Sequence, residues 1–200
     1  MFSQDIVTEM AAHTERPVIT PLSNPTSLSE TQPADLIAWT GGRALIATGS
    51  PFDPVSHDGV RYQIAQANNA LIFPGLRLGV TVARARRVSD GMLAAAAAAL
   101  AGLSDLATPG AAVLPPVTSL RQVSAAIAVA ITQAAQAEGL AQSQLDDPAK
   151  QVAQAMWTPE YPAIQPILFR SRQSRQLPPV LPKWSSKTGK SAPSSTVTSP

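Results

Sequence analysis

Hydrophobic and polar positions alternate along the chain in a way that predicts short buried strands between amphipathic helices. Residues 3–13 have helical spacing, with Ser3 placed to cap the helix and Asp5 in its first turn. The apolar positions of this segment fall on one side, and they are Ile6, Val7, Met10 and Ala11. We therefore expect an opening helix with one buried face.

The next run, Pro17–Thr26 with the sequence PVITPLSNPT, is apolar and stops at an amide followed by a proline. Val18, Ile19 and Leu22 favour a strand in a run too short for a helix, and the proline after Asn24 prevents its continuation. We expect a buried parallel strand that ends at Asn24. Ligands of open α/β sheets bind beyond the carboxyl ends of strands, so Asn24 is a candidate ligand-binding residue. The alternative is that its side chain only caps the next turn.

A second strand is predicted after one helix. Pro33 suits the first turn of that helix, and Gly41-Gly42 ends it. Residues Ala44–Thr48 (ALIAT) form a short apolar run closed by Gly-Ser-Pro, which favours a strand buried on both faces. A strand, a crossover helix and a second strand together predict a parallel α/β unit. Residues Val60–Ala65 (VRYQIA) are consistent with either a hairpin arm or a third strand.

The second half of the chain is predicted to be helical. We expect a helical segment over 70–88 with a bend at Phe73-Pro74-Gly75, an alanine-rich helix from 91 to about 106 capped by Ser89, a helix from 118 to 139, and a short helix over 147–157. The residues expected on the apolar faces of the two longest helices are Leu93, Leu100 and Leu103, and Leu120, Val123, Ile127 and Ile131.

Amides and turn residues follow the predicted strands. Asn24 ends the first strand, Gly49 and Ser50 follow the second, and Asn68 and Asn69 precede a helix. Three such places at the same edge of a parallel sheet form one wall of a pocket for a planar, hydrogen-bonding ligand. Amides orient a ligand but are poor proton donors and bases, so this wall lacks an acid, a base and a metal of its own.

The charge distribution argues against a nucleic-acid partner. The chain has 15 basic and 13 acidic residues, but six of the basic residues and no acidic ones lie from Arg170 onward. The body is therefore mildly acidic, and its few aromatic residues do not form a base-stacking platform. There is no cysteine, which excludes disulfides and thiolate metal sites and is compatible with the cytoplasm. The N-terminal residues do not resemble a secretory signal, and no stretch is a convincing membrane span.

The sequence lacks the motifs of other common binding sites. The chain has no GxGxxG after a strand and no Walker lysine motif, so no phosphate-binding loop is recognisable. His13 and His57 lack metal-ligand spacing and are interpreted as surface residues. Asp146-Asp147 is interpreted as a helix cap, and the arginines at 84, 86 and 87 as favourable charges near a helix C-terminus.

Several segments, in order and spacing, resemble the C-terminal part of the NAD-type malic enzymes over roughly residues 3–163. They are PLSNPT (21–26), PADLIAWTGGRALIATGSPF (33–52), IAQANNALIFPG (64–75), VSDGMLAAA (88–96), VSAAIAVAI (123–131) and AMWTPEY (155–161). The resemblance implies an α/β fold, the C-terminal portion of a Rossmann-like NAD-binding domain over residues 1–165. A disordered tail rich in Pro, Ser and Lys is expected over 166–200.

The resemblance also implies a function and a set of site residues. The family oxidatively decarboxylates malate to pyruvate and CO2 with NAD or NADP and Mg²⁺ or Mn²⁺, usually as a homo-oligomer. Asn24 is implied at the substrate and nicotinamide site, Gly49 and Ser50 near the cofactor, and Asn68 with Asn69 at the malate carboxylates. The family's catalytic tyrosine and lysine, its metal ligands and its glycine-rich loop belong upstream of the residues matched here. The chain is therefore expected to be a fragment that is inactive alone.

Two features depart from the family pattern, and two rival interpretations stay open. Arg77 stands where the family usually has a small residue, so it is expected to crowd helix packing, and the tail after about Pro166 has no counterpart in the family. One rival is a non-catalytic interaction or regulatory fragment that assembles with complete malic enzyme subunits. The other is a remnant that does not fold, because loss of half a sheet exposes a strand edge and apolar helix faces.

Overall fold

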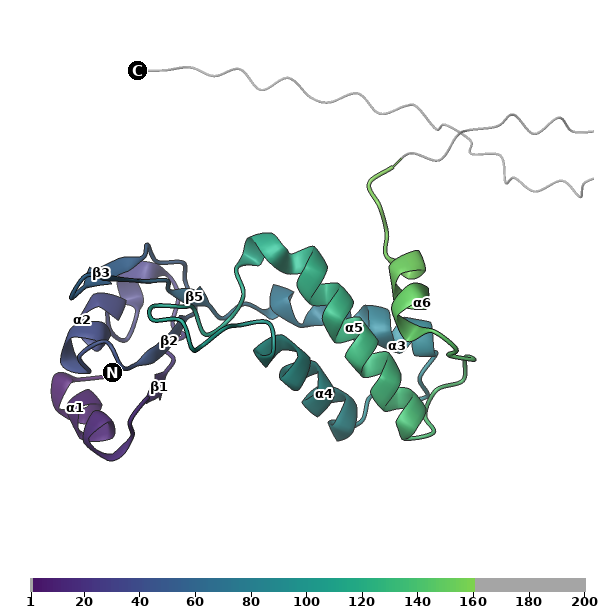
Figure 1. Cartoon of the computed structure of the whole chain (residues 1–200), viewed down its shortest axis with the longest axis horizontal. Coiled ribbons are helices and arrows are strands. Elements are labelled where there is room, and N and C mark those ends of the chain that lie inside the picture. Colours follow the sequence, from purple (N-terminus) through teal and green to yellow (C-terminus); the bar gives the residue numbers. More distant parts are fainter. Residues whose placement is uncertain (1, 161–200) are drawn as a thin grey trace, which may run out of the picture. The chain divides into compact units, whose positions relative to one another are not determined.

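Three short parallel strands form the sheet that organises the N-terminal half of the chain (Figure 1). The computed structural model describes residues 2–160, and its part up to Pro159 forms one compact unit; the predicted tail at 166–200 lies outside the described residues. The sheet order is β1-β2-β5, with Val18 paired to Leu45 and Ala47 paired to Ala65. The elements of this half are α1 (Gln4–His13), β1 (Val18–Ile19), α2 (Pro33–Trp39), β2 (Leu45–Thr48) and β5 (Ala65–Gln66). The predicted parallel α/β unit is confirmed.

The first strand is shorter than expected. It contains only Val18 and Ile19, and Leu22 is 50% exposed, so the prediction of a buried strand reaching Asn24 is wrong. The physical reason is Pro21, which has no N–H to donate to the sheet. The opening helix is confirmed, but its buried stripe is narrow: Ile6 is exposed, and the Ser3 side chain makes no capping hydrogen bond.

The segment after β2 contains both of the alternatives left open by its sequence. β3 (Val55–His57) and β4 (Val60–Tyr62) form an antiparallel hairpin, and β5 then joins the parallel sheet. The hairpin turn has positive φ at Asp58 (47°) and Gly59 (76°). An Asp-Gly pair is the sequence that such a two-residue turn favours, because both central residues are left-handed.

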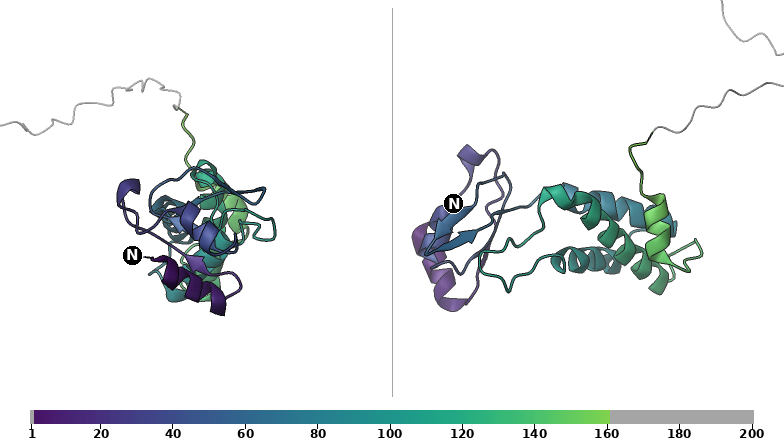
Figure 2. Two further views of the ribbon diagram at one scale, coloured as in Figure 1. Left: turned by 90° about the vertical axis from the view of Figure 1, so that its left-hand side faces the viewer. Right: turned by 45° about the horizontal axis from the view of Figure 1, so that its top comes forward.

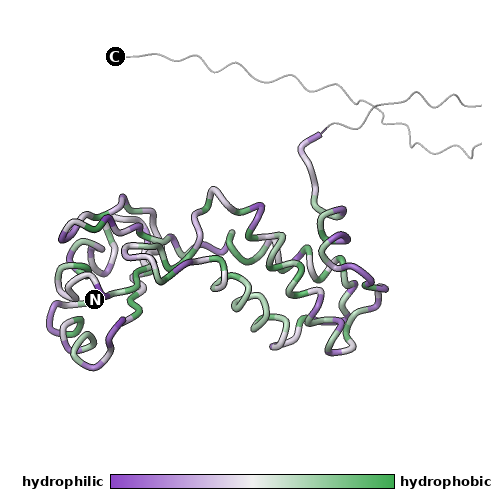
Figure 3. Tube along the Cα trace, viewed as in Figure 1, coloured by the Kyte–Doolittle hydropathy of each residue, from purple (hydrophilic) through white to green (hydrophobic). Residues whose placement is uncertain are grey.

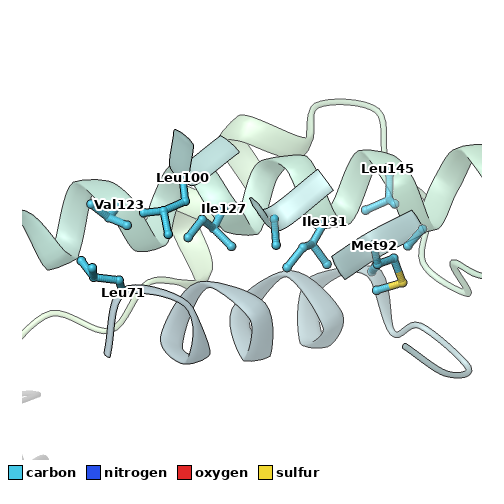
Figure 4. Packing of buried hydrophobic residues seen from close by; sticks show 10 residues of the cluster. Leu71, Met92, Leu100, Val123, Ile127, Ile131 and Leu145 are labelled. Atoms are coloured by element: carbon cyan, nitrogen blue, oxygen red, sulfur yellow. The ribbon is translucent and has the colours of Figure 1, made fainter. Parts of the chain in front are cut away.

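Helices form the second half, and the longest of them is central to its core. α5 packs against both α3 and α4, as Figures 1 and 2 show. The side chains of Val123, Ile127 and Ile131 on α5 are buried against Leu71, Met92 and Leu100 (Figure 4). The elements of this half are α3 (Phe73–Ala83), α4 (Asp90–Ala101), α5 (Leu120–Ala137) and α6 (Pro148–Ala155), with the 3₁₀ turns η2 (Asn69–Leu71) and η3 (Val117–Ser119). A further 3₁₀ turn, η1 (Thr26–Leu28), lies between β1 and α2 in the N-terminal half.

Two glycines allow α3 to lie unusually close to α5. A Cβ added at Gly75 would stand 2.8 Å from the Ile127 Cβ, and one added at Gly79 would stand 2.7 Å from the Ala128 carbonyl oxygen. Arg77 lies between these positions and is exposed, so the prediction that it crowds helix packing is wrong. Because residues two apart on a helix point in different directions, the face toward α5 contains positions 75 and 79 but not 77.

The buried face predicted for α4 is right at Leu100 and wrong at Leu93 and Leu103. Its buried residues are Met92, Ala96 and Leu100, spaced four apart, whereas Leu93 is 46% exposed and Leu103 lies beyond the end of the helix. Because α4 is mostly alanine, its faces differ little in hydrophobicity, and the sequence pattern did not identify the buried face. The Ser89 cap is confirmed, since its Oγ accepts from the Met92 N–H at 3.1 Å.

The trace is hydrophobic along β1 and most of β2 and in parts of α3, α4 and α5 (Figure 3). Among residues 2–160, no helix is both long and apolar enough to cross a bilayer.

Candidate functional site

Four of the five residues singled out in the sequence lie at one pocket. A cavity of about 300 Å³ is lined by Asn24, Gly49, Asn68 and Asn69, together with Leu22, Ala67, Leu71, Ile72, Leu100 and Leu114. Its polar residues come from the segments that follow β1, β2 and β5 in the chain, which is the edge at which parallel sheets bind ligands. The apolar side is contributed by η2 and by residues of the helical half.

Two hydrogen bonds and a close backbone contact fix the turn after β2. The Gly49 N–H donates to the Pro21 carbonyl oxygen at 3.0 Å, which ties this turn to the segment that carries Asn24. A Cβ at position 49 would clash with the Leu22 backbone, so only glycine permits this approach. Below the turn, the fully buried Thr48 hydroxyl donates to the Ser50 carbonyl oxygen at 2.8 Å.

Ser50 does not line the pocket but lies behind Asn24. Its side chain is buried, with the residue 5% exposed, and its Oγ is 2.6 Å from Asn24 Oδ1. Asn24 Nδ2 is 3.5 Å from the Leu22 carbonyl oxygen, and the peptide bond between Asn24 and Pro25 is cis. In this geometry Ser50 contacts the Asn24 amide, and it is Asn24, not Ser50, that lines the pocket.

Glu30 closes the loop that contains Asn24 through a hydrogen bond from Ser23. Its Oε2 accepts from the Ser23 N–H at 3.0 Å. Hydrogen bonds from its own backbone N–H and from that of Ser23 lower the pKa of the Glu30 carboxyl below its ordinary value, against a smaller opposing effect of burial. The segment from Ser23 to Glu30 is thus closed by a charge-assisted hydrogen bond.

Asn68 caps the 3₁₀ turn η2. Its Oδ1 accepts from the Ala70 N–H at 2.9 Å, as an asparagine does when it initiates a turn. The capping role that the sequence left open for Asn24 is therefore observed at Asn68. Both Asn68 and Asn69 are exposed at the pocket, on the turn that leads directly into α3.

The described residues supply binding groups but no site for a divalent cation. The residues that line the pocket include no carboxylate and no histidine. Across residues 2–160, no three His, Cys, Asp or Glu side chains are grouped as metal ligands. Carboxylates are the ligands that Mg²⁺ prefers in proteins, so the residues present do not fit this ion. The pocket can bind and orient a ligand, and it offers no side chain suited to act as acid or base.

Sequence reasoning missed Glu30 and the apolar side of the pocket. Glu30 lies in a loop, where no periodic pattern marks a contact with a backbone N–H seven residues earlier. Leu100 and Leu114 come from the helical half and reach the pocket only through the tertiary fold. A long-range contact of this kind has no signal in a single sequence.

The fold and the pocket define the class: a parallel α/β domain with a pocket at the carboxyl edge of its strands. Residues 1–136 match the family model described as malic enzyme, NAD binding domain. The chain belongs to the malic enzyme family.

Similar proteins support this assignment over most of the chain. The NAD-dependent malic enzyme 3 of Bacillus subtilis is 52% identical over 166 residues, which is 83% of this chain and 29% of that protein. The malolactic enzyme of Lactiplantibacillus plantarum is 48% identical over 163 residues, or 82% of this chain and 30% of that protein. The chain thus spans less than a third of the length of these relatives.

Solved structures agree with the fold. The malic enzyme from Pyrococcus horikoshii superposes with a TM-score of 0.61 at 26% identity, covering 76% of this chain and 31% of that one. The malic enzyme of Entamoeba histolytica has a TM-score of 0.59 at 24% identity, a likeness that supports the fold alone.

Proposed function

We propose that this chain supplies the carboxamide wall of the NAD and malate site of an NAD-dependent malic enzyme. The observation that carries the proposal is the meeting of Asn24, Gly49, Asn68 and Asn69 at one pocket on the carboxyl edge of the sheet. In the complete enzyme, malate is oxidised by NAD and loses CO2, which gives pyruvate, CO2 and NADH. The chain's residues bind and orient these molecules but do not transfer the proton.

Each residue has a distinct part in the proposal. Asn24 contacts the substrate and the nicotinamide, and Asn68 with Asn69 binds the malate carboxylates. Gly49 lies close to the cofactor in a turn that packs directly against the Leu22 backbone, and Ser50 acts on the cofactor side through Asn24. NADP is the alternative cofactor that the resemblance leaves open. Assembly as a homo-oligomer and a cytoplasmic location are further predictions.

The metal and the proton-transfer groups are proposed to come from other parts of the complete enzyme. The described residues do not fit Mg²⁺ or Mn²⁺, so no step of the reaction is assigned to a metal held by them. The purified chain should therefore show no turnover with malate, NAD and Mn²⁺. Turnover well above the blank would contradict this part of the proposal.

A chimaera tests the positive part. Residues 3–163 of this chain would replace the matching segment of the Bacillus subtilis relative, which is 52% identical. We expect malate-dependent NAD reduction within about tenfold of the parent enzyme. A chimaera that folds and binds NAD but does not oxidise malate would contradict the proposed wall.

A second candidate function is assembly with a complete malic enzyme subunit. It is favoured by a groove of about 710 Å³ whose lining includes Phe73, Leu78, Leu120, Met156 and Trp157. Trp157 is 76% exposed, and large exposed apolar patches commonly mark interaction sites. Mixing the chain with a complete subunit and measuring the mass of the complex separates this candidate from an isolated chain, because assembly adds one chain mass.

A further inference from the structure

The groove of about 710 Å³ beside Trp157 shares no residue with the pocket of the carboxamides. It lies between α3, α5 and the residues that follow α6, which are neighbouring elements in Figure 1. From α3 it is lined by Pro74, Leu78 and Thr81, which lie on one face of the helix. Its volume is within the range of about 300–1,000 Å³ that is typical of small-molecule sites.

Two arginines give the groove a positive charge. Arg77 on α3 and Arg121 on α5 line it, and no acidic residue does. The Arg121 Nη1 donates to the Trp157 carbonyl oxygen at 2.9 Å, so its guanidinium is fixed beside the end of α6 with further N–H groups left for a ligand. The ion pairs within residues 2–160 involve only His13 and His57. Both arginines therefore lack an acidic partner in this part of the chain and favour an anion from outside.

The helix termini add to this preference. Gly75 on α3 packs against Ile127 on α5, and Gly79 packs against Ile131, so the two helices run in the same direction. The groove includes the first residues of both helices, where the positive ends of their dipoles lie. In neither helix does the N-cap side chain make a capping hydrogen bond. The dipoles and the arginines thus favour the same sign of ligand charge.

The rest of the lining favours an apolar ligand body. Phe73 is 59% exposed and Trp157 is 76% exposed, and Leu78, Leu120 and Met156 also line the groove. Covering such side chains removes apolar surface from water, at roughly 25 cal/mol per Å². The groove therefore combines a large apolar surface with a few positively charged donors.

A second copy of this chain is a poor occupant of the groove. Two-fold symmetry would place the same face of both copies at one interface. Arg77 and Arg121 of both copies would then meet without an acidic residue from the groove of either copy. Like charges at an interface disfavour association. Charge complementarity instead indicates an anionic ligand.

We propose that this groove is a binding site for a small molecule that joins a carboxylate to an apolar body. Arg77 and Arg121 bind the carboxylate, and Phe73 and Trp157 cover the apolar body. The site lies outside the pocket of the proposed function, and its existence does not depend on that function.

The start of α3 connects this groove with the pocket of the carboxamides. Leu71 and Ile72 line that pocket, whereas Phe73, the next residue, lines the groove. The Leu71 and Ile72 N–H groups donate to the carbonyl oxygens of Asn68 and Asn69 at 3.0 and 3.1 Å. A ligand that displaces the first turn of α3 therefore also displaces these two asparagines. Only the interpretation of this coupling as regulation of a malate site rests on the proposed function.

The test uses the full ¹⁵N-labelled chain and NMR, with decanoate as the anionic probe and decylammonium as a cation of the same chain length. We expect decanoate to shift the indole N–H signal of Trp157 and the side-chain NH2 signals of Asn68 and Asn69. Decylammonium should bind at least about fivefold more weakly, since it meets two arginines. Aromatic rings alone would favour the cation, so the order of the two affinities separates the explanations.

Arg77→Gln should weaken decanoate binding about fivefold. Arg86→Gln is the matched control, because it removes the same charge from an exposed residue outside the groove, and it should change the affinity less than twofold. Circular dichroism checks that both variants fold.

Decylammonium binding as tightly as decanoate, or equal effects of the two substitutions, would overturn the inference. So would a complete malic enzyme subunit that shifts the Trp157 signal when decanoate does not. Shifts at Trp157 without shifts at Asn68 and Asn69 would contradict the coupling. Malate is absent throughout, so a failure here is distinguishable from a failure of the proposed function.

Discussion

Replacing Gly79 with alanine tests the close packing of α3 on α5. This packing sets the position of the turn that contains Asn68 and Asn69. α3 begins two residues after η2, so its position on α5 sets the position of that turn. A Cβ at 79 would stand 2.7 Å from the Ala128 carbonyl oxygen and 2.8 Å from the Ile131 Cβ. Neither atom belongs to a flexible chain end, so relief requires the two helices to move apart.

Two effects of opposite sign compete in Gly79→Ala. Alanine favours the interior of a helix over glycine by about 1 kcal/mol. Ordinary carbon contacts lie at about 3.5–4.0 Å, so the helices must separate by roughly 0.8 Å, and overpacking of this kind costs about 1–3 kcal/mol. Because α5 contacts both neighbouring helices, the strain also reaches α4, and we expect a net loss of about 1–2 kcal/mol.

Gly102→Ala is the matched control. Gly102 follows the end of α4 with φ of −67°, and the nearest atom to an added Cβ is the Ala98 carbonyl oxygen at 3.4 Å. This substitution should leave stability unchanged or raise it by up to about 1 kcal/mol. Urea denaturation followed by circular dichroism measures both changes. A Gly79→Ala chain as stable as the wild type, or an equal loss in the control, would refute the packing argument.

Three further predictions concern single side chains. Ser50→Ala should lower the free energy of unfolding by about 1 kcal/mol in urea denaturation, because Asn24 loses its hydroxyl donor, whereas Ser27→Ala on the exposed side of the same loop should change little. The lowered pKa of Glu30 means that its contribution to stability is present above its ordinary value of 4.5 and is lost as the pH falls through the lower folded-state value. Thermal melts from about pH 6 to about pH 3 should therefore fall less steeply for Glu30→Gln than for the wild type, and parallel curves would contradict this. Asp147→Ala should cost about 1 kcal/mol by removing the cap at the Lys150 N–H, and an unchanged urea midpoint would count against it.

The sequence predicted the elements that have a strong period or a strong stop. The apolar run at β2, the caps at Ser89 and Asp147 and the buried spacing of Val123, Ile127 and Ile131 appear in the structure as expected. Patterns of this kind depend on neighbours in the chain. α4 shows their limit, because a row of alanines offers no contrast by which to choose a buried face.

The site was predictable in its residue types and not in their contacts. Strand ends followed by amides indicated Asn24, Asn68 and Asn69, and the fold places all three at one pocket. The position of Ser50 behind Asn24 depends on the backbone contact between Gly49 and Pro21, which joins segments 28 residues apart. Only the packed structure reveals which polar side chain lines the pocket and which one supports it from outside the pocket.

The most direct test of the proposed wall is the effect of Asn24→Ala on malate oxidation by the chimaera. Ser29→Ala is the control, since Ser29 lies in the same loop and its hydroxyl donates only to the Thr31 carbonyl oxygen at 2.9 Å. Loss of one oriented donor from a site typically costs on the order of a hundredfold in rate. We predict a fall of that size in kcat/KM for Asn24→Ala and less than about twofold for Ser29→Ala. Equal effects of the two substitutions would contradict the assignment of Asn24 to the site.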